Sequence, residues 1–400
     1  MNASLNSTWQ SGSDAWVLSI DYFPEIANGA FAVTNSSGEL ILYSLKDTSK
    51  PLAKVKAHGS SINATNKINE YSLATAAADG VRVWDLRHDL QQPAMTLTSP
   101  KNPNYLSLAS KDGIALAAGT ELAGADAEIH IWDLRQPELM ARSFVDSHHD
   151  DVTNLKFHLT LPYLMSGSTD GCVNVYNLDE LDEDEALHQA INFASVHLCH
   201  FIRPDRIAIL THMETLGFFD LNNTDYEVNT EAAPKELGDV RTLWPNCEYV
   251  VDLFTDYIVY GANLEGTLSL MPFDPKLESF DKSKIINFAR AHGEEVVRDV
   301  CVIPGTKTAL TCGEDGLVKS WSLPFVIESQ GTVASKDLES ESMDIDERSD
   351  KKKDKKEKKD KKEKREKKDK KERKEKKKEK KEKKSKSDKK LKKEIRFKPY

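Results

Sequence analysis

The chain has 400 residues, of which 39% are hydrophobic, so it is long enough for one large domain with appendages. Its charge is divided unevenly: residues 351–400 hold 31 Lys and Arg against 12 Asp and Glu, whereas residues 1–350 hold 25 against 53. The net charge of −9 therefore combines a body of about −28 with a tail of about +19. This asymmetry predicts a charged partner, or a contact between the two parts.

Cysteine usage and hydropathy exclude further classes of protein. The five cysteines are odd in number and form no C-x-x-C pair, which predicts reduced thiols in a nuclear or cytosolic protein. No stretch approaches the roughly 18 apolar residues of a membrane-spanning helix, and the first residues lack the apolar run of a secretory signal. We therefore expect a soluble protein inside the cell, with no membrane segment.

The first part of the chain indicates β-structure. Residues 1–13 are polar apart from Trp9 and a few small residues, and they are either a leader or a strand that is added to a later sheet. From residue 16 to residue 45, alternating apolar residues predict the strands WVLSIDYF, GAFAVTN and ELILYSL, with Gly38 in a turn. This segment is the first structural unit.

A related pattern recurs at intervals of about 40 residues. Its copies are AHGSSINATN with AAADGVRVWDLR (57–87), AGADAEIHIWDLR (123–135), SHHDDVTNLKFH with SGSTDGCVNVYNL (147–178), and AHGEEVVRDV with TCGEDGLVKSWSL (291–323). A His near the start, an Asp-Gly turn and a Trp-Asp near the end are the signature of WD repeats. Each such repeat forms a four-stranded blade, and the blades close into a ring.

The spacing within three repeats predicts a chain of hydrogen bonds that is typical of WD-repeat blades. A His lies about twenty residues before the turn Asp, and a Thr or Ser lies four residues before it. We expect the Asp to accept from the His, the His to pair with the hydroxyl, and the hydroxyl to pair with an indole, with a Tyr replacing Trp in one repeat. The residues are His58, Thr75, Asp79 and Trp84; His148, Ser166, Asp170 and Tyr176; and His292, Thr311, Asp315 and Trp321. The repeat already explains them, so we interpret them as structural.

The remaining blades are less regular. Blade three is assigned to YLSLAS, IALAAGT and EIHIWDLR, and blade five to SVHLCHFI, RIAILTHM and TLGFFDL. Blade six is assigned to DVRTLWP, YIVYGAN and GTLSLMPF, without a turn Asp or a Trp-Asp pair at the usual place. The prediction is an all-β, seven-bladed WD-repeat propeller over residues 14–325.

After Pro324 the periodicity ends. Residues 326–350 form an acidic linker, and residues 351–390, the main part of the basic tail 351–400, are almost only Lys, Glu, Asp and Arg. Such a composition cannot bury a core, so we predict a disordered Lys/Glu-rich tail, in which Lys and Glu at i,i+4 can support transient helix. The last ten residues, LKKEIRFKPY, are either a short docking segment or a chain end without a role.

No cluster of residues predicts catalysis, a metal or a cofactor. His197, Cys199 and His200 are close in sequence, but on a strand His200 points to the opposite face from the other two. The acidic run at 179–185 lacks the Gly of a calcium loop and is expected to be a solvated loop. No phosphate-binding Gly-rich loop or nucleophile elbow occurs. We therefore expect that the protein is not an enzyme and has no catalytic, cofactor-binding or metal-binding residues.

Several segments together resemble one family. SHHDDVTNLKFH, SGSTDGCVNVYNL, DEDEAL, GDVR and HGEEVVRDV, followed by TCGEDGLVKSW, stand in the order found in the WD repeat-containing protein 89 family. The resemblance covers about residues 16–323 and is strongest from Asp146 onward; the charged tail is outside it. It implies a propeller without assigned catalytic residues, so function has to be argued from the surface.

The expected function is a non-catalytic protein-interaction scaffold that binds protein partners through its faces. The candidate partner-binding residues at the rim of the channel are Asp151, Thr169, Arg241, Arg298 and Glu314. One alternative is an escort for a basic protein, such as a ribosomal protein or histone, held on the acidic body. Another is weak RNA contact through the tail, although acidic residues interrupt its Lys runs and no aromatic residues offer base stacking. We expect a monomer in the nucleus or nucleolus and the cytoplasm.

Overall fold

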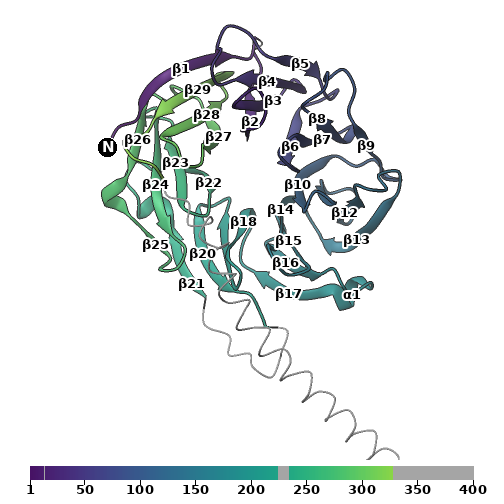
Figure 1. Ribbon diagram of the computed structural model, residues 1–400. Coiled ribbons are helices and arrows are strands. Elements are labelled where there is room, and N and C mark those ends of the chain that lie inside the picture. The colour runs from purple at the N-terminus through teal and green to yellow at the C-terminus, as the bar shows by residue number, and fades with distance from the viewer. Residues whose placement is uncertain (13, 224–233, 328–400) are drawn as a thin grey trace, which may run out of the picture. The chain divides into compact units, whose positions relative to one another are not determined.

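The computed structural model describes residues 1–12, 14–223 and 234–327. The predicted tail at 351–400, and the predicted linker from residue 328 onward, lie outside these residues. Within the described ranges, the strands form seven antiparallel sheets around a central opening (Figure 1). The predicted seven-bladed, all-β propeller is confirmed.

Blades 1 to 4 follow one another along the chain. Blade 1 contains β2 (Val17–Phe23), β3 (Ala30–Asn35), β4 (Glu39–Ser44) and β5 (Ala53–Lys56). Blade 2 contains β6 (Ile62–Lys67), β7 (Ser72–Ala77), β8 (Gly80–Asp85) and β9 (Met95–Leu97). Blade 3 contains β10 (Tyr105–Lys111), β11 (Ala115–Thr120), β12 (Ala127–Asp133) and β13 (Met140–His148). Blade 4 contains β14 (Val152–Phe157), β15 (Tyr163–Ser168), β16 (Cys172–Asn177) and β17 (Leu187–Asn192).

The other three blades complete the ring. Blade 5 contains β18 (Val196–Arg203), β19 (Arg206–Thr211), β20 (Thr215–Asp220) and β21 (Lys235–Asp239). Blade 6 contains β22 (Tyr249–Leu253), β23 (Tyr257–Ala262) and β24 (Thr267–Asp274), with the short β25 (Ser279–Phe280) and β26 (Ile286–Ala289) at its outer edge. Blade 7 contains β27 (Val297–Val302), β28 (Thr308–Gly313), β29 (Leu317–Ser322) and β1 (Ser4–Gln10).

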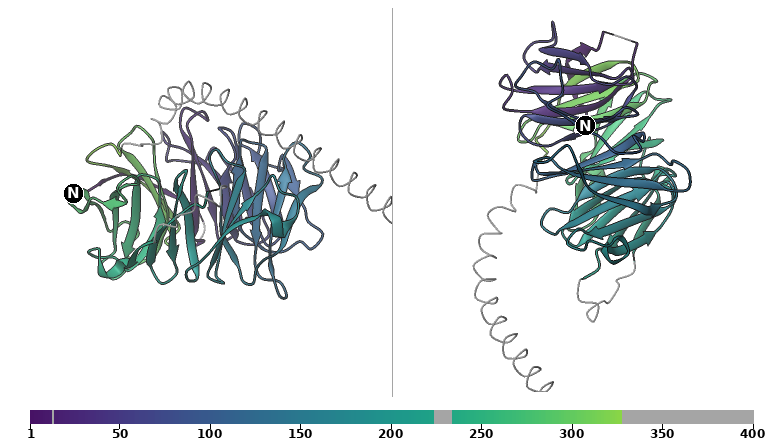
Figure 2. Two further views of the ribbon diagram at one scale, coloured as in Figure 1. Left: turned by 90° about the horizontal axis from the view of Figure 1, so that it is seen from below. Right: turned by 90° about the vertical axis from the view of Figure 1, so that its right-hand side faces the viewer.

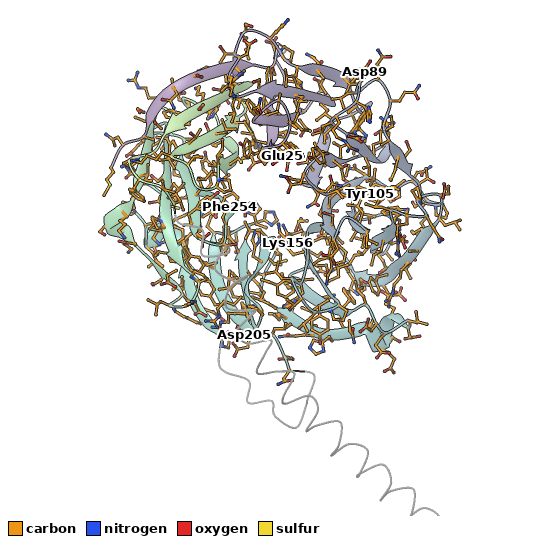
Figure 3. All side chains as sticks on the ribbon, viewed as in Figure 1. Glu25, Asp89, Tyr105, Lys156, Asp205 and Phe254 are labelled. Carbon is orange, nitrogen blue, oxygen red and sulfur yellow. The ribbon has the colours of Figure 1, made fainter. Side chains whose placement is uncertain are left out.

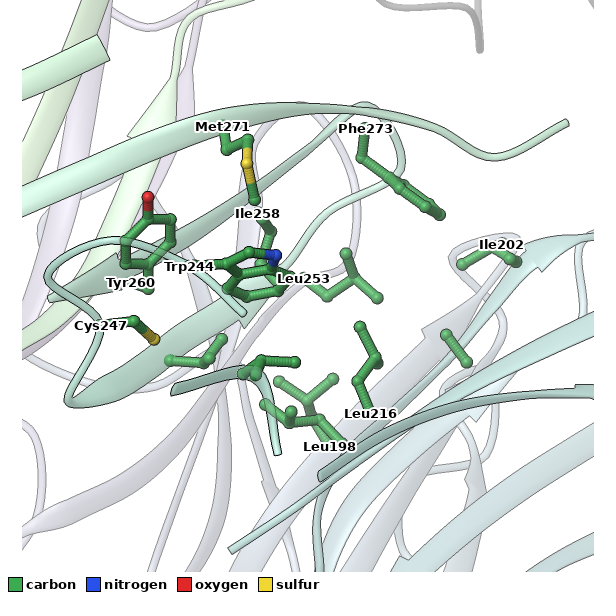
Figure 4. Close-up of a cluster of buried hydrophobic side chains, with 14 of the residues drawn as sticks. Leu198, Ile202, Leu216, Trp244, Cys247, Leu253, Ile258, Tyr260, Met271 and Phe273 are labelled. Atoms are coloured by element: carbon green, nitrogen blue, oxygen red, sulfur yellow. The ribbon is translucent and has the colours of Figure 1, made fainter. Parts of the chain in front are cut away.

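The apolar core lies between neighbouring blades. The second strand of a blade packs on both faces, and in β3, β15, β19 and β23 every residue is buried. Strands covered on both faces read as continuous apolar runs rather than as strict alternation. Between blades 5 and 6, Leu198, Leu216, Trp244 and Leu253 belong to one such cluster (Figure 4).

The antiparallel order gives the ring two faces, which Figure 2 shows from the side. We call the top face the one formed by the loops between the second and third strands of each blade and by the loops that join consecutive blades. The turn that contains Asp315 and the loop that contains His292 both belong to this face. The opposite face carries the remaining loops.

The N-terminal strand closes the ring. β1 pairs antiparallel with β29, with Leu5 opposite Trp321 and Trp9 opposite Val318. Trp9 is buried and packs edge-on against Phe31 of blade 1, with ring centroids 5.0 Å apart. Of the two alternatives that the sequence leaves open for residues 1–13, the structure therefore shows the added strand, which joins the two ends of the described chain.

The assignment of DVRTLWP as the inner strand of blade six is wrong. Its first residue, Asp239, ends β21 and caps the short 3₁₀ helix η1 (Val240–Thr242), because its carboxylate accepts the amide hydrogen of Arg241. The inner strand of blade 6 is β22, ten residues later. The apolar residues of DVRTLWP include Trp244, which fills the space between blades 5 and 6 instead of lining the channel.

The acidic run at 179–185 is also more ordered than expected. Its second half begins α1 (Glu183–Ala186), whose N-cap Asp182 accepts from the amides of Asp184 and Glu185. The Glu183 carboxylate accepts from the amide of Val145 over 2.9 Å and from the Ser147 hydroxyl over 2.7 Å, which ties the run to β13. Among the residues that the structure describes, no helix has the length and apolar character to span a membrane.

Candidate functional site

The expected chain of hydrogen bonds is present in blade 7. Nδ1 of His292 lies 2.7 Å from Oδ1 of Asp315, and Nε2 lies 2.8 Å from Oγ1 of Thr311. The indole Nε1 of Trp321 donates to the same hydroxyl over 3.0 Å. The carboxylate can accept only from an Nδ1–H, so Nε2 accepts from the Thr311 hydroxyl. Each of these polar atoms therefore has its hydrogen-bond partner within blade 7.

Blades 2 and 4 contain corresponding chains. In blade 2, His58 lies 2.5 Å from Asp79 and 2.7 Å from Thr75, whose hydroxyl accepts from Trp84 over 2.9 Å. In blade 4, the His148–Asp170 and His148–Ser166 distances are 2.9 and 2.7 Å. The replacement residue Tyr176 accepts from Asn174 over 3.1 Å, and burial raises its pKa to about 12 against the effect of hydrogen bonds that include Ser166.

Ionisation within these chains follows from burial. Burial lowers the pKa of His292, although Asp315 opposes this effect, so the imidazole is neutral. Burial raises the pKa of Asp315, but the hydrogen bonds from His292 and the Leu317 amide, together with the charge of Lys319, oppose this effect, and the pKa is lowered overall. A neutral imidazole between a carboxylate and a hydroxyl stabilises the blade and has no access to a substrate. These twelve residues are therefore part of the scaffold.

The five rim residues do not form one cluster. Asp151 and Thr169 lie together on blade 4, where the Thr169 amide donates to the Asp151 carbonyl over 3.0 Å. Arg241 pairs with Asp239 next to η1, over 2.8 Å between Nη2 and Oδ2. Arg298 and Glu314 pair with each other on blade 7. All five lie on the top face, in three separate places.

The central channel contains buried carboxyl groups, each with a hydrogen-bond partner on a neighbouring strand. Asp252 lies 3.2 Å from Nε2 of His200, and Asp21 accepts from Thr65 over 2.8 Å. Asp299 accepts from the amide of Ile20 over 2.7 Å, and burial, with the nearby charges of Asp21 and Asp252, raises its pKa to about 7. Lys156 lies beside the central opening (Figure 3).

The side chains of His197, Cys199 and His200 have three different neighbours. His200 contacts Asp252, and the Cys199 thiol contacts the side-chain oxygen of Asn154 over 3.5 Å. His197 stacks on His212, with ring centroids 5.3 Å apart. No group of three or more potential ligands comes together among these described residues.

A pocket on the top face is lined by residues of blades 5, 6 and 7. Its cavity volume is about 400 Å³. It is lined by His197, His212, Glu214, Glu248, Tyr249, Val250, Val251, Asn263, Val296, Val297 and Arg298. Arg298 is the one rim candidate in this lining. The inner strands β18, β22 and β27 and the β19–β20 turn supply most of the wall, so the pocket is formed by three consecutive blades.

Tyr249 shapes the floor of this pocket. A Cβ on Gly261 would lie 2.4 Å from the Tyr249 hydroxyl oxygen, so the adjacent strand has room for the ring because residue 261 is glycine. The hydroxyl accepts the amide hydrogen of Val297 over 3.0 Å and thereby links blade 6 to blade 7. Burial raises the pKa of Tyr249, so it is protonated at neutral pH.

Glu214 occupies an unusual position in the pocket. It stands where blades 2, 4 and 7 have Gly80, Gly171 and Gly316, and like them it has a positive φ, of 58°. A residue with a Cβ in this left-handed conformation costs about 1–2 kcal/mol. Only 8% of Glu214 is exposed, its Oε2 accepts from the Val250 amide over 3.2 Å, and burial raises its pKa to about 7.

Glu214 is not among the site residues predicted from the sequence. The available signal was the replacement of Thr-Asp-Gly or Glu-Asp-Gly by His-Met-Glu in the turn at 212–214. Strained and buried polar residues concentrate at functional sites, which makes this turn a better candidate than the paired rim residues.

A serine and a histidine are hydrogen-bonded to each other beside the pocket. The Ser195 hydroxyl lies 3.0 Å from Nδ1 of His212, which superficially resembles a nucleophile with its base. Among the described residues, no carboxylate is hydrogen-bonded to His212, and Ser195 does not line the pocket. A serine nucleophile needs an imidazole that is oriented by a third group, so this pair lacks the arrangement of a triad.

The top face carries an excess of carboxylates. Six of its cations each pair with a carboxylate: Lys54 with Glu39, Arg82 with Asp79, Lys101 with Glu128, Arg241 with Asp239, Arg298 with Glu314 and Lys319 with Asp315. Two further cations are Lys56 and Arg290. The carboxylates of this face without a Lys or Arg ion pair among the described residues include Asp146, Asp150, Asp151, Glu214, Glu248, Glu265, Glu294 and Glu295. The face is therefore acidic.

Four-stranded blades around a central opening, with His, Asp, hydroxyl and indole groups linked inside the blades, define a WD-repeat propeller. Comparison with known proteins leads to the same class. The family model described as "WD domain, G-beta repeat" matches residues 141–177 and 283–322. Propellers of this family generally serve as protein-interaction scaffolds and are generally not enzymes.

Similar proteins occur in distant organisms. An uncharacterized WD repeat-containing protein of Saccharomyces cerevisiae is 40% identical over 319 residues, covering 78% of this chain and 79% of the relative. The Arabidopsis thaliana WD repeat-containing protein GTS1 is 29% identical over 321 residues (74% and 79%). The WD repeat-containing protein 89 homolog of Dictyostelium discoideum is 25% identical over 338 residues (80% and 87%). The chain belongs to the WD-repeat family, and the resemblance noted in its sequence is confirmed.

Proposed function

We propose that this protein is a non-catalytic interaction platform whose top face binds a basic segment of a protein partner. The observation that carries the proposal is the excess of carboxylates without Lys or Arg partners on that face. An acidic surface attracts a basic partner during diffusion and fixes its orientation on contact. The rigid ring supports the proposal because it holds the loops that display these carboxylates in fixed positions.

An escort role for a whole basic protein, such as a ribosomal protein or a histone, is the second candidate. The same surface favours it, because an acidic face can neutralise the charge of a basic protein. The two roles differ in extent. A platform binds one segment, whereas an escort covers most of the cationic surface of its client and keeps it soluble.

The test measures binding of a short fluorescent peptide of alternating serine and lysine to the full chain. The variant Asp146→Asn/Glu294→Gln/Glu295→Gln removes three exposed charges from the top face. The matched control, Asp179→Asn/Glu180→Gln/Asp184→Asn, removes three exposed charges from the opposite face. Exposed ion pairs contribute roughly 0.2–1 kcal/mol each, so we expect about fivefold weaker binding for the first variant at low salt.

The control variant should bind nearly as the unchanged chain does. Equal weakening by both variants would show that net charge, and not the top face, attracts the peptide. A peptide of alternating serine and glutamate should not bind. If the lysine peptide does not bind the unchanged chain at low salt, the proposed function is wrong.

A further inference from the structure

The pocket between blades 5, 6 and 7 has the size and lining of a site for one long side chain. Its volume of about 400 Å³ lies within the usual range for ligand pockets, and Val250, Val251, Val296 and Val297 line its walls. The aliphatic part of a lysine or arginine packs well against such apolar surface while its charged end seeks a polar partner. The lining therefore suits an amphipathic cationic side chain.

The charges in the pocket favour a cation over an anion. The guanidinium of Arg298 pairs with Glu314 and lies over the Trp16 ring, so its charge is already compensated. Burial lowers the pKa of His197, which keeps this imidazole neutral near pH 7. The remaining charged groups of the lining are the carboxyls of Glu214 and Glu248. An anion would face both of them.

Glu214 is the group in this pocket whose ionised form a bound cation would stabilise most. Its Oε2 accepts from the Val250 amide, whereas its Oε1 has no hydrogen-bond partner among the described residues. Its backbone has the left-handed conformation that the corresponding glycines of blades 2, 4 and 7 adopt without strain. The Glu214 carboxyl is therefore buried in a strained turn at the wall of a cavity, and one of its oxygens is free in the described part of the chain. There it lacks the cation that would complete an ion pair.

We propose that this pocket receives a lysine or arginine side chain of the basic segment bound at the top face, and that Glu214 is its ion-pair partner. The inference rests on the proposed function and specifies where that segment is anchored. A central anchor in a pocket, surrounded by weak exposed charges, is the usual distribution of binding energy in an interface. Glu214 thus determines affinity, and the exposed carboxylates attract the segment.

The anchor makes binding dependent on pH. A cation favours the ionised form of Glu214, so peptide binding releases a proton from this group near neutral pH. Lowering the pH through the raised pKa of Glu214, about 7, therefore weakens binding. The titratable and charged groups that face Glu214 or line the pocket are His197, His212, Asp239, Arg241, Cys247, Glu248, Tyr249 and Arg298. Protonation of His197 at lower pH would also weaken the binding of a cation, so the pH dependence has to be compared between variants.

The experiment compares Glu214→Gln with Glu265→Gln in the full chain, using the peptide of alternating serine and lysine. Glutamine keeps the shape of the side chain and an acceptor for the Val250 amide. Glu265 is an exposed carboxylate on the same face, so its replacement changes the net charge equally. We expect Glu214→Gln to bind at least about fivefold more weakly than Glu265→Gln at about pH 8, and the difference to shrink towards about pH 6.

Each outcome decides the inference. Equal affinity of the two variants at about pH 8 overturns the pocket assignment; if the triple variant of the top face still weakens binding, the proposed function survives. If the lysine peptide binds no variant and not the unchanged chain, both proposals fail. Glu214→Gly guards against misfolding, because glycine adopts the left-handed conformation at no steric cost, and it should show the same loss of binding.

Discussion

Replacing Asp315 by alanine should destabilise the propeller, because a buried imidazole then loses its acceptor. Asp315 Oδ1 lies 2.7 Å from His292 and also accepts from the Leu317 amide over 3.1 Å. His292 is 3% exposed, so water does not readily replace the carboxylate. A buried donor left unpaired costs about 1–3 kcal/mol, and we expect a loss near the middle of that range, about 2 kcal/mol.

Thermal melting of the full chain measures this loss. For a large domain, 1 kcal/mol shifts the melting temperature by roughly 2–4 °C, so a decrease of about 4–8 °C is expected. The control is Asp89→Ala on the outer side of blade 2, an exposed carboxylate without a hydrogen bond among the described residues (Figure 3). Asp79→Ala should cost less than Asp315→Ala, because its side chain is 36% exposed against 17%.

The pH dependence of the melting temperature gives a second check on the hydrogen bonds between His292 and Asp315. Burial lowers the pKa of His292 below its unfolded value, so its contribution to stability is present above about pH 6.5 and is lost as the pH falls. Asp315 opposes that shift. The alanine variant should therefore lose stability more steeply on acidification. A melting temperature within about 1 °C of the Asp89→Ala control would refute the reasoning, since it would show that the chain of hydrogen bonds contributes nothing.

Three further predictions concern the channel and the tail. Burial raises the pKa of Asp299 to about 7, so the contribution of this group to stability is lost as the pH rises from about 4 to 7. The melting temperature of Asp299→Asn should therefore rise relative to that of the unchanged chain over that range, and a constant difference contradicts the assignment. We propose that the Lys-rich segment 351–390 directs a nuclear or nucleolar pool; a fluorescent fusion ending at Asp350 should lose it, and an unchanged distribution contradicts the idea. Removing residues 351–400 should raise the affinity for the lysine peptide at low salt if the tail competes for the acidic body. Equal affinities of the long and short chains would show that it does not.

The sequence by itself determined the class of fold and the internal scaffold of the regular blades. His58, Asp79, His292 and Asp315 are recognisable because each blade is a local unit of about 40 residues whose contacts recur at fixed separations. Periodic alternation likewise marks most strands, since it reflects which face each side chain presents within one sheet.

Only the tertiary structure decided which segments meet between blades. Trp244 has the sequence context of an inner strand, yet it fills an interblade space, because apolar periodicity does not say which surface covers a residue. β1 pairs with β29 across more than 300 residues, and no local pattern encodes that register. Glu214, Tyr249 and Arg298 come from three blades, and they line one pocket because the apolar packing between neighbouring blades fixes the distances between them.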